Sequence, residues 1–132
     1  METPNHDTLR DLERGTPALF LWSARTVPAL LGAQFLLAGL ALFGGTPWDL
    51  HAGVGVAVGL PVLVLAGGAL GLARLRGFVW WAGLTLILYL TQVGLAMADN
   101  GALALHPFNG ALLLTSALVL LAKVERRRAH HP

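Results

Sequence analysis

The sequence has no cysteine and very few charged residues. Without cysteine the chain can form no disulfide, no zinc–thiolate site, no cysteine-ligated iron–sulfur cluster and no covalent cysteine–heme bond. Only 12% of the residues are charged and 55% are hydrophobic, whereas about 25% of a soluble domain is charged. Too few ionisable side chains are therefore present to cover a surface that faces water. Most of the surface is expected to face lipid.

Two further features are missing. The net charge is only +2, and no face large enough to follow a nucleic-acid groove collects the basic residues, so we expect no nucleic-acid partner. The polar first residues, from Met1 to Arg14, are not followed by a short apolar segment with a small-residue cleavage site. A cleaved signal peptide is therefore not expected.

What the sequence does contain is four apolar blocks, at about 17–43, 50–73, 78–98 and 106–124. Each is close to the length of about 20 residues that crosses the hydrocarbon core of a bilayer as a helix. In lipid the backbone must satisfy its own hydrogen bonds, which favours helices, and the alternation typical of a transmembrane barrel is absent. The sequence predicts an all-α fold, a four-helix transmembrane bundle covering 17–124.

The segments on either side are polar. Residues 1–16 are predicted to form an N-terminal tail, and residues 125–132 a basic C-terminal tail. An alternative for residues 8–25 is an amphipathic helix that lies on the inner surface of the membrane.

The basic residues predict the orientation. All nine lie before or at the start of the first block, between the second and third blocks, or after the fourth: Arg10, Arg14, Arg25, Arg74, Arg76, Lys123, Arg126, Arg127 and Arg128. Because basic segments stay on the cytoplasmic side, both termini are expected there. The expected location is a bacterial inner membrane, crossed several times.

The two halves of the chain resemble each other. Gln34 in the first block corresponds to Gln92 in the third, and the segment 50–55 (LHAGVG) corresponds to 105–110 (LHPFNG). Glutamine and histidine are separated by 17 residues in the first half and by 14 in the second, and the difference falls in the loops. The repeat predicts two helical hairpins related by a pseudo-two-fold axis along the membrane normal.

This axis would place His51 and His106 at the same depth on opposite helices. Two facing imidazoles are the arrangement that supplies both axial ligands of a heme iron. Gly55 and Gly110 each follow a histidine by four residues, on the same helix face, and we expect them to leave room for the macrocycle. The predicted cofactor is one non-covalent heme b. The alternative for each histidine is an interfacial residue that contacts headgroups or a backbone carbonyl.

Other polar residues could belong to the same site. Gln34 and Gln92 are expected inside the bundle, either in a helix–helix hydrogen bond or beside the histidines and the porphyrin. Trp48 and Asn109 are expected at the outer rim, where heme propionates would need partners. His6, His130 and His131 lie in polar tails, and no role is assigned to them.

The segments around Gln34, 48–51 (WDLH), Gln92 and 105–110 resemble a family of small four-helix bacterial membrane proteins of uncharacterised function. They are more distantly similar to one four-helix half of heme A synthase and to four-helix membrane b-type cytochromes. This resemblance covers about 34–121 and implies heme binding at His51 and His106. The acidic residue expected of a synthase active site is not evident, so heme modification is not implied.

Two ligands from the protein would leave no open position on the iron. The expected role is therefore electron transfer, or heme sensing or handling, rather than catalysis. The alternative from another class is a cofactor-free membrane subunit that packs against a partner. A transporter is disfavoured because no charged residue lies at mid-membrane. Besides lipid and heme, the expected partners are a second copy of the chain or a larger membrane complex.

Overall fold

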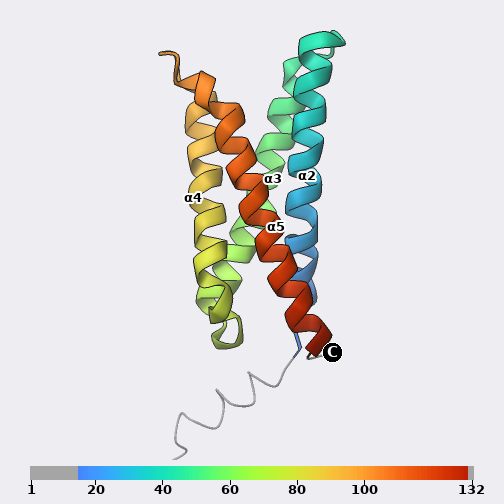
Figure 1. Ribbon diagram of the computed structural model, residues 1–132, viewed down its shortest axis with the longest axis vertical. Coiled ribbons are helices and arrows are strands. Elements are labelled where there is room, and N and C mark those ends of the chain that lie inside the picture. Colours follow the sequence, from blue (N-terminus) through green and yellow to red (C-terminus); the bar gives the residue numbers. More distant parts are fainter. Residues whose placement is uncertain (1–14, 131–132) are drawn as a thin grey trace, which may run out of the picture.

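The four apolar blocks fold into four long helices (Figure 1). The computed structural model describes residues 15–130. The α-helices are α2 (Ala18–Phe43), α3 (Trp48–Gly71), α4 (Val79–Ala96) and α5 (His106–His130). Two 3-10 helices, η1 (Ala73–Phe78) and η2 (Ala102–Leu105), lead into α4 and α5. Residues 15–130 contain no strand, which confirms the predicted all-α fold.

All four helices are long and apolar enough to cross a membrane, with η1 and η2 extending the third and fourth crossings. The protein is a multi-pass membrane protein. The surface helix considered for residues 8–25 falls partly on residues 1–14, which lie outside the described residues. Residues 18–25 belong to α2 itself, where Trp22 and Arg25 lie in its first two turns.

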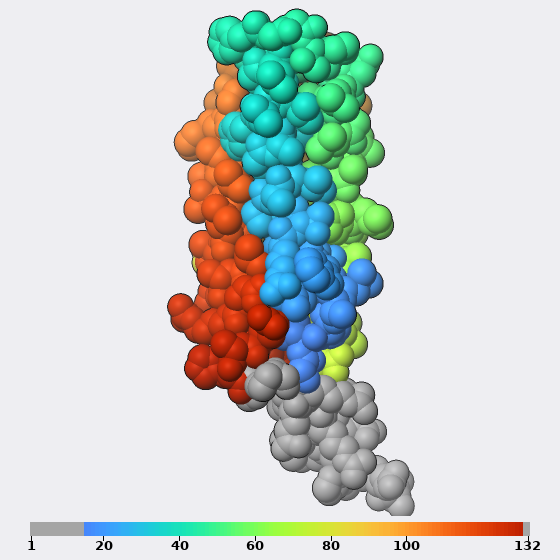
Figure 2. Space-filling view, turned by 90° about the vertical axis from the view of Figure 1, so that its right-hand side faces the viewer, coloured from blue at the N-terminus to red at the C-terminus, as the bar shows by residue number. Residues whose placement is uncertain are grey.

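The helices form a ring in the order α2, α3, α4, α5, and α5 closes against α2. Figure 2 shows α2 between α3 and α5. The first described residues and the end of α5 lie together, and we call this the terminal end of the bundle (Figure 1). The turns at 44–47 and 97–105 lie at the opposite end, which we call the loop end. Consecutive helices thus run antiparallel, in two hairpins.

The buried core is confined to the terminal half. It is made of apolar side chains from all four helices and η1: Phe20, Ala24, Val27, Leu31, Val58, Val62, Leu65, Ala69, Leu75, Phe78, Ala82, Leu113, Ala117, Leu120 and Val124. No residue between Leu31 and Val58 is buried, and none between Thr85 and Asn109. The two hairpins accordingly diverge toward the loop end (Figure 1).

Polar contacts join the helices in the packed half. Arg25 Nε donates to Glu125 Oε1 at 2.6 Å, which connects α2 to α5. The buried hydroxyls of Thr85 on α4 and Ser116 on α5 are hydrogen-bonded at 2.8 Å. Since lipid tails are as apolar as leucine, such contacts and close packing hold membrane helices together more than the hydrophobic effect does.

The basic segment after Val124 is helical instead of forming a separate tail. α5 continues to His130, so residues 125–130 of the predicted tail extend the fourth helix. Arg128 pairs with Glu125 one turn earlier at 3.1 Å, and basic side chains in a last turn are stabilised by the negative end of the helix dipole. The predicted boundary at residue 124 marks the end of the apolar part of α5, which continues as a charged helix to His130.

Two adjacent glycines in α3 offer a test of the packing. A Cβ at Gly68 would lie 2.8 Å from Cδ2 of the buried Phe20 ring, whereas a Cβ at Gly67 would meet no atom within 4 Å. We expect Gly68→Ala to lower the free energy of unfolding by about 1–3 kcal/mol through overpacking. Gly67→Ala should be neutral or stabilising by up to about 1 kcal/mol, because alanine favours the helix.

Reversible unfolding in mixed micelles measures both variants. The same loss in both, or none in Gly68→Ala, would contradict the packing of α3 against α2.

Candidate functional site

His51 and His106 meet across the bundle. His51 lies one turn into α3, and His106 is the first residue of α5, on the helix diagonally opposite in the ring. Their ring centroids are 6.2 Å apart, with an angle of 62° between the ring planes. Both residues are partly buried. The structure thus brings together the two histidines that the repeat pairs.

Each histidine is held by the preceding helix of its own hairpin. Nδ1 of His51 lies 3.1 Å from the backbone oxygen of Gln34, and Nδ1 of His106 lies 3.2 Å from the backbone oxygen of Gln92. A carbonyl only accepts, so the proton is on Nδ1 in both rings. Neither Nε2 has a hydrogen-bond partner within residues 15–130. The lone pair of each Nε2 is therefore free to bind a metal.

The two glycines admit glutamine side chains. A Cβ on Gly55 would lie 2.7 Å from Nε2 of Gln34, and one on Gly110 would lie 3.1 Å from Nε2 of Gln92. A glutamine side chain thus occupies the space beside each glycine, and binding of a macrocycle there stays a prediction. The missing side chains of the two glycines allow the two helices of each hairpin to approach, with the glutamine amide filling the space.

The pseudo-symmetry ends at Asn109. This residue is 7% exposed, and its Nδ2 donates to the Leu88 backbone oxygen at 2.9 Å and to Gln92 Oε1 at 2.6 Å. It was expected at the rim, but the third position after His106 lies nearly one turn deeper and faces the bundle interior. The corresponding residue in the first hairpin is Val54, whose side chain has no hydrogen-bond donor. Gln34 Oε1 is accordingly buried without a hydrogen-bond partner.

Tyr89 belongs to the same region and was not selected from the sequence. Its hydroxyl on α4 lies 3.2 Å from the backbone oxygen of Gly55 and 3.4 Å from that of Val56. It fits beside Gly59, where an added Cβ would lie 2.7 Å from the hydroxyl oxygen. A usable signal existed: Tyr89 is the only tyrosine in the sequence and stands three residues before Gln92.

Among the other residues considered, Trp48 contacts His51, whereas His130 lies at the other end of the bundle. The Trp48 ring lies edge-on to His51, with 5.6 Å between the ring centroids. His130 is at the terminal end, where its Nδ1 contacts the Arg126 backbone oxygen. His6 and His131 lie outside the described residues.

A family model matches residues 34–101, just over half of the chain. Its description is a family of unknown function, DUF6220. The chain belongs to this family. The DUF6220 match begins at Gln34 and includes His51, Tyr89 and Gln92, whereas His106, Asn109 and Gly110 follow it. No curated protein and no solved structure matches the chain. The similarity to heme A synthase and to membrane b-type cytochromes therefore stays a prediction.

The two imidazoles of the site can be compared with the ligands of a heme iron, and the space beside the two glycines with the room that a macrocycle needs. Two imidazole nitrogens bound to one metal from opposite sides, at about 2 Å each, place the ring centroids roughly 6 Å apart. The observed separation is 6.2 Å. Glutamine side chains, not open space, lie beside Gly55 and Gly110. The ring separation fits one metal between the imidazoles, and a macrocycle would be centred on that metal, between the two rings.

The difference between the two glutamines of this DUF6220 protein is testable. We expect Gln92→Leu to lower the free energy of unfolding by about 1 kcal/mol more than Gln34→Leu does, because only Gln92 Oε1 accepts a hydrogen bond from a buried amide. Both variants keep the backbone oxygens that hold the histidines. Unfolding in mixed micelles compares them, and equal losses would argue against the asymmetry.

Proposed function

We propose that this protein binds one non-covalent heme b, with Nε2 of His51 and Nε2 of His106 as the axial ligands. The observation that carries the proposal is the anchoring of both rings. Each Nδ1 donates to a backbone oxygen of its own hairpin, at 3.1 Å and 3.2 Å. Metal-binding histidines almost always donate their second ring N–H in this manner, because the bond sets both the tautomer and the ring orientation.

The chemistry of the donor set favours heme over a bare metal ion. Residues 15–130 contain no group of three or more histidine, cysteine, aspartate or glutamate side chains that could hold a metal. A tetrahedral zinc site would need more ligands than the two imidazoles. A porphyrin brings four nitrogens of its own, so two histidines complete the coordination of its iron.

Ligation by two histidines determines which roles are available. An iron with both axial positions occupied by the protein exchanges electrons but has no open position for oxygen. His51 and His106 would then hold the metal. The two hairpins would keep the imidazole rings in a fixed orientation. We infer electron transfer, or heme sensing or handling, as the function, and no catalytic residue is assigned.

The second candidate function is a cofactor-free membrane subunit. The hydrogen bonds from Asn109 to Gln92 and to Leu88 satisfy several polar groups within the protein itself. The uncovered apolar side chains of the loop half, such as Leu36 at 65% exposed and Phe108 at 65% exposed, would then contact a second copy or another membrane subunit. In this case the histidine pair would only connect the two hairpins.

A visible spectrum separates the two functions. Protein purified from heme-sufficient cells, or supplied with hemin, is expected to show a Soret band and sharp α and β bands after reduction with dithionite. His51→Ala and His106→Ala should each abolish the low-spin spectrum, since each removes one axial ligand.

The matched control is His130→Ala, which removes an exposed histidine on the same helix as His106 and should leave the spectrum unchanged. A wild-type protein that stays colourless with hemin would sink the heme proposal and favour the cofactor-free subunit. Normal spectra in both site variants would place the ligands elsewhere.

We further propose that the terminal end faces the cytoplasm of a bacterial inner membrane and that the histidine pair lies toward the opposite side. Within residues 15–130 every arginine and lysine lies in the terminal half or beyond it, and the loop end has none. The positive-inside rule assigns the basic end to the cytoplasm.

A reporter fused to the C-terminus tests the orientation. Green fluorescent protein in this position should fluoresce, and alkaline phosphatase should be inactive. The control is the same pair of reporters inserted after Gly45, in the turn between α2 and α3, where the activities should be reversed. An active C-terminal phosphatase would overturn the orientation.

A further inference from the structure

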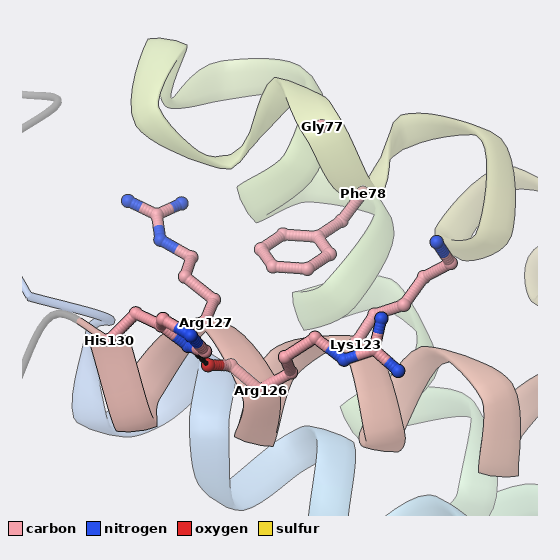
Figure 3. A pocket seen from close by; sticks show the side chains of 6 residues that line it. All are labelled: Gly77, Phe78, Lys123, Arg126, Arg127 and His130. Carbon is pink, nitrogen blue, oxygen red and sulfur yellow. Dashed lines mark hydrogen bonds between the residues drawn. The ribbon is translucent and has the colours of Figure 1, made fainter.

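A basic pocket lies at the terminal end, far along the bundle from the histidine pair. It has a volume of about 380 Å³ and is formed where η1 faces the last turns of α5 (Figure 3). Its lining residues are Gly77, Phe78, Lys123, Arg126, Arg127 and His130. Figure 3 shows the Phe78 ring facing α5, with the side chains of Lys123 and Arg127 on either side of it.

The positive charge of this pocket is not neutralised within residues 15–130. The carboxylates in this part of the chain are Asp49 and Asp99, toward the loop end, and Glu125. Glu125 is already shared between Arg25 at 2.6 Å and Arg128 at 3.1 Å. Among the described residues, no carboxylate is paired with Lys123 or Arg126. Within residues 15–130 the pocket therefore presents several cations to a ligand and no carboxylate.

One arginine of the pocket wall, Arg127, has a buried Nε without a hydrogen-bond partner among residues 15–130. The same holds for Nε of Arg74, which does not line the pocket. Arg127 is held in place from two other directions, by donating through a terminal nitrogen to the Arg74 backbone oxygen and by lying 5.8 Å from the centre of the Phe78 ring. Because Nε of Arg127 is inaccessible, the basic groups that a ligand can reach are the exposed side chains of Lys123 and Arg126. A phosphate oxygen is an acceptor that guanidinium groups suit well.

We propose that this pocket binds the phosphate headgroup of an anionic phospholipid. The location favours a lipid over a free anion, because the pocket lies at the end of the membrane-spanning helices where the exposed rings of Trp22 and Trp80 also lie, in the first turns of α2 and α4. Tryptophans on such helices concentrate at the headgroup level. Basic pockets between helices at this level bind phospholipid headgroups. Phe78 supplies apolar surface, and Gly77 leaves open space, since a Cβ there would meet no atom within 4 Å.

The test is native mass spectrometry of the detergent-solubilised protein titrated with dioleoyl-phosphatidylglycerol or with dioleoyl-phosphatidylcholine. The wild-type protein should retain the anionic lipid preferentially. Arg126→Gln should weaken its binding by about fivefold, the contribution of one cation near a headgroup. Gly77→Leu should weaken binding by filling the pocket without changing its charge.

The matched control is Arg76→Gln, which removes the same side chain at the same end but does not line the pocket. It should leave binding within about twofold. Equal loss in Arg76→Gln and Arg126→Gln would show general charge attraction and overturn the proposal, as would equal retention of both lipids. Full competition by inorganic phosphate would assign the pocket to a free anion instead.

Melting temperatures in lipid-free detergent, measured for each variant, verify that the proteins compared are folded. None of these experiments depends on heme binding, because the two sites lie at opposite parts of the bundle.

Discussion

The structure depends on one constraint: in hydrocarbon, every peptide N–H and C=O needs a partner within the protein. Four apolar segments meet it by forming helices, and the remaining polar side chains must find partners between those helices. The hydroxyls of Thr85 and Ser116 do so in the packed half, and the amides of Asn109 and Gln92 do so near the histidines. These polar contacts add to the apolar core that joins the helices in the terminal half.

The same constraint explains how the two histidine rings are held. A neutral imidazole inside a bundle needs an acceptor for its N–H, and the backbone oxygens of Gln34 and Gln92 provide it. With Nδ1 satisfied, Nε2 of each ring has no hydrogen-bond partner within residues 15–130. The apolar core lies in the terminal half, and close to the histidines Asn109 and Gly110 are buried as well.

Much of the fold followed from the sequence, and part of the site did. Apolar length predicted four crossings, and the repeated glutamine and histidine predicted that His51 and His106 would meet. A contact to a backbone carbonyl was the alternative named for each histidine, and the structure shows such a contact for both rings. Which carbonyl holds each ring has no sequence signal. Asn109 was placed at the rim because depth was counted along the chain, whereas its orientation depends on the tilt of α5 against α4. The glutamine side chains beside Gly55 and Gly110 likewise depend on how the two helices of each hairpin pack.

The sequence by itself determined that the chain crosses a membrane four times as two similar hairpins, because hydrocarbon leaves an apolar segment of this length little choice but a helix. Only the tertiary structure decided how the hairpins meet. It joined them tightly at the terminal end, oriented the two imidazoles across the axis, and left Gln34 Oε1 without the partner that Asn109 gives Gln92. It also brought η1 against α5 to form the basic pocket. These features depend on side-chain volumes and on contacts between helices far apart in the chain, which local hydropathy does not encode.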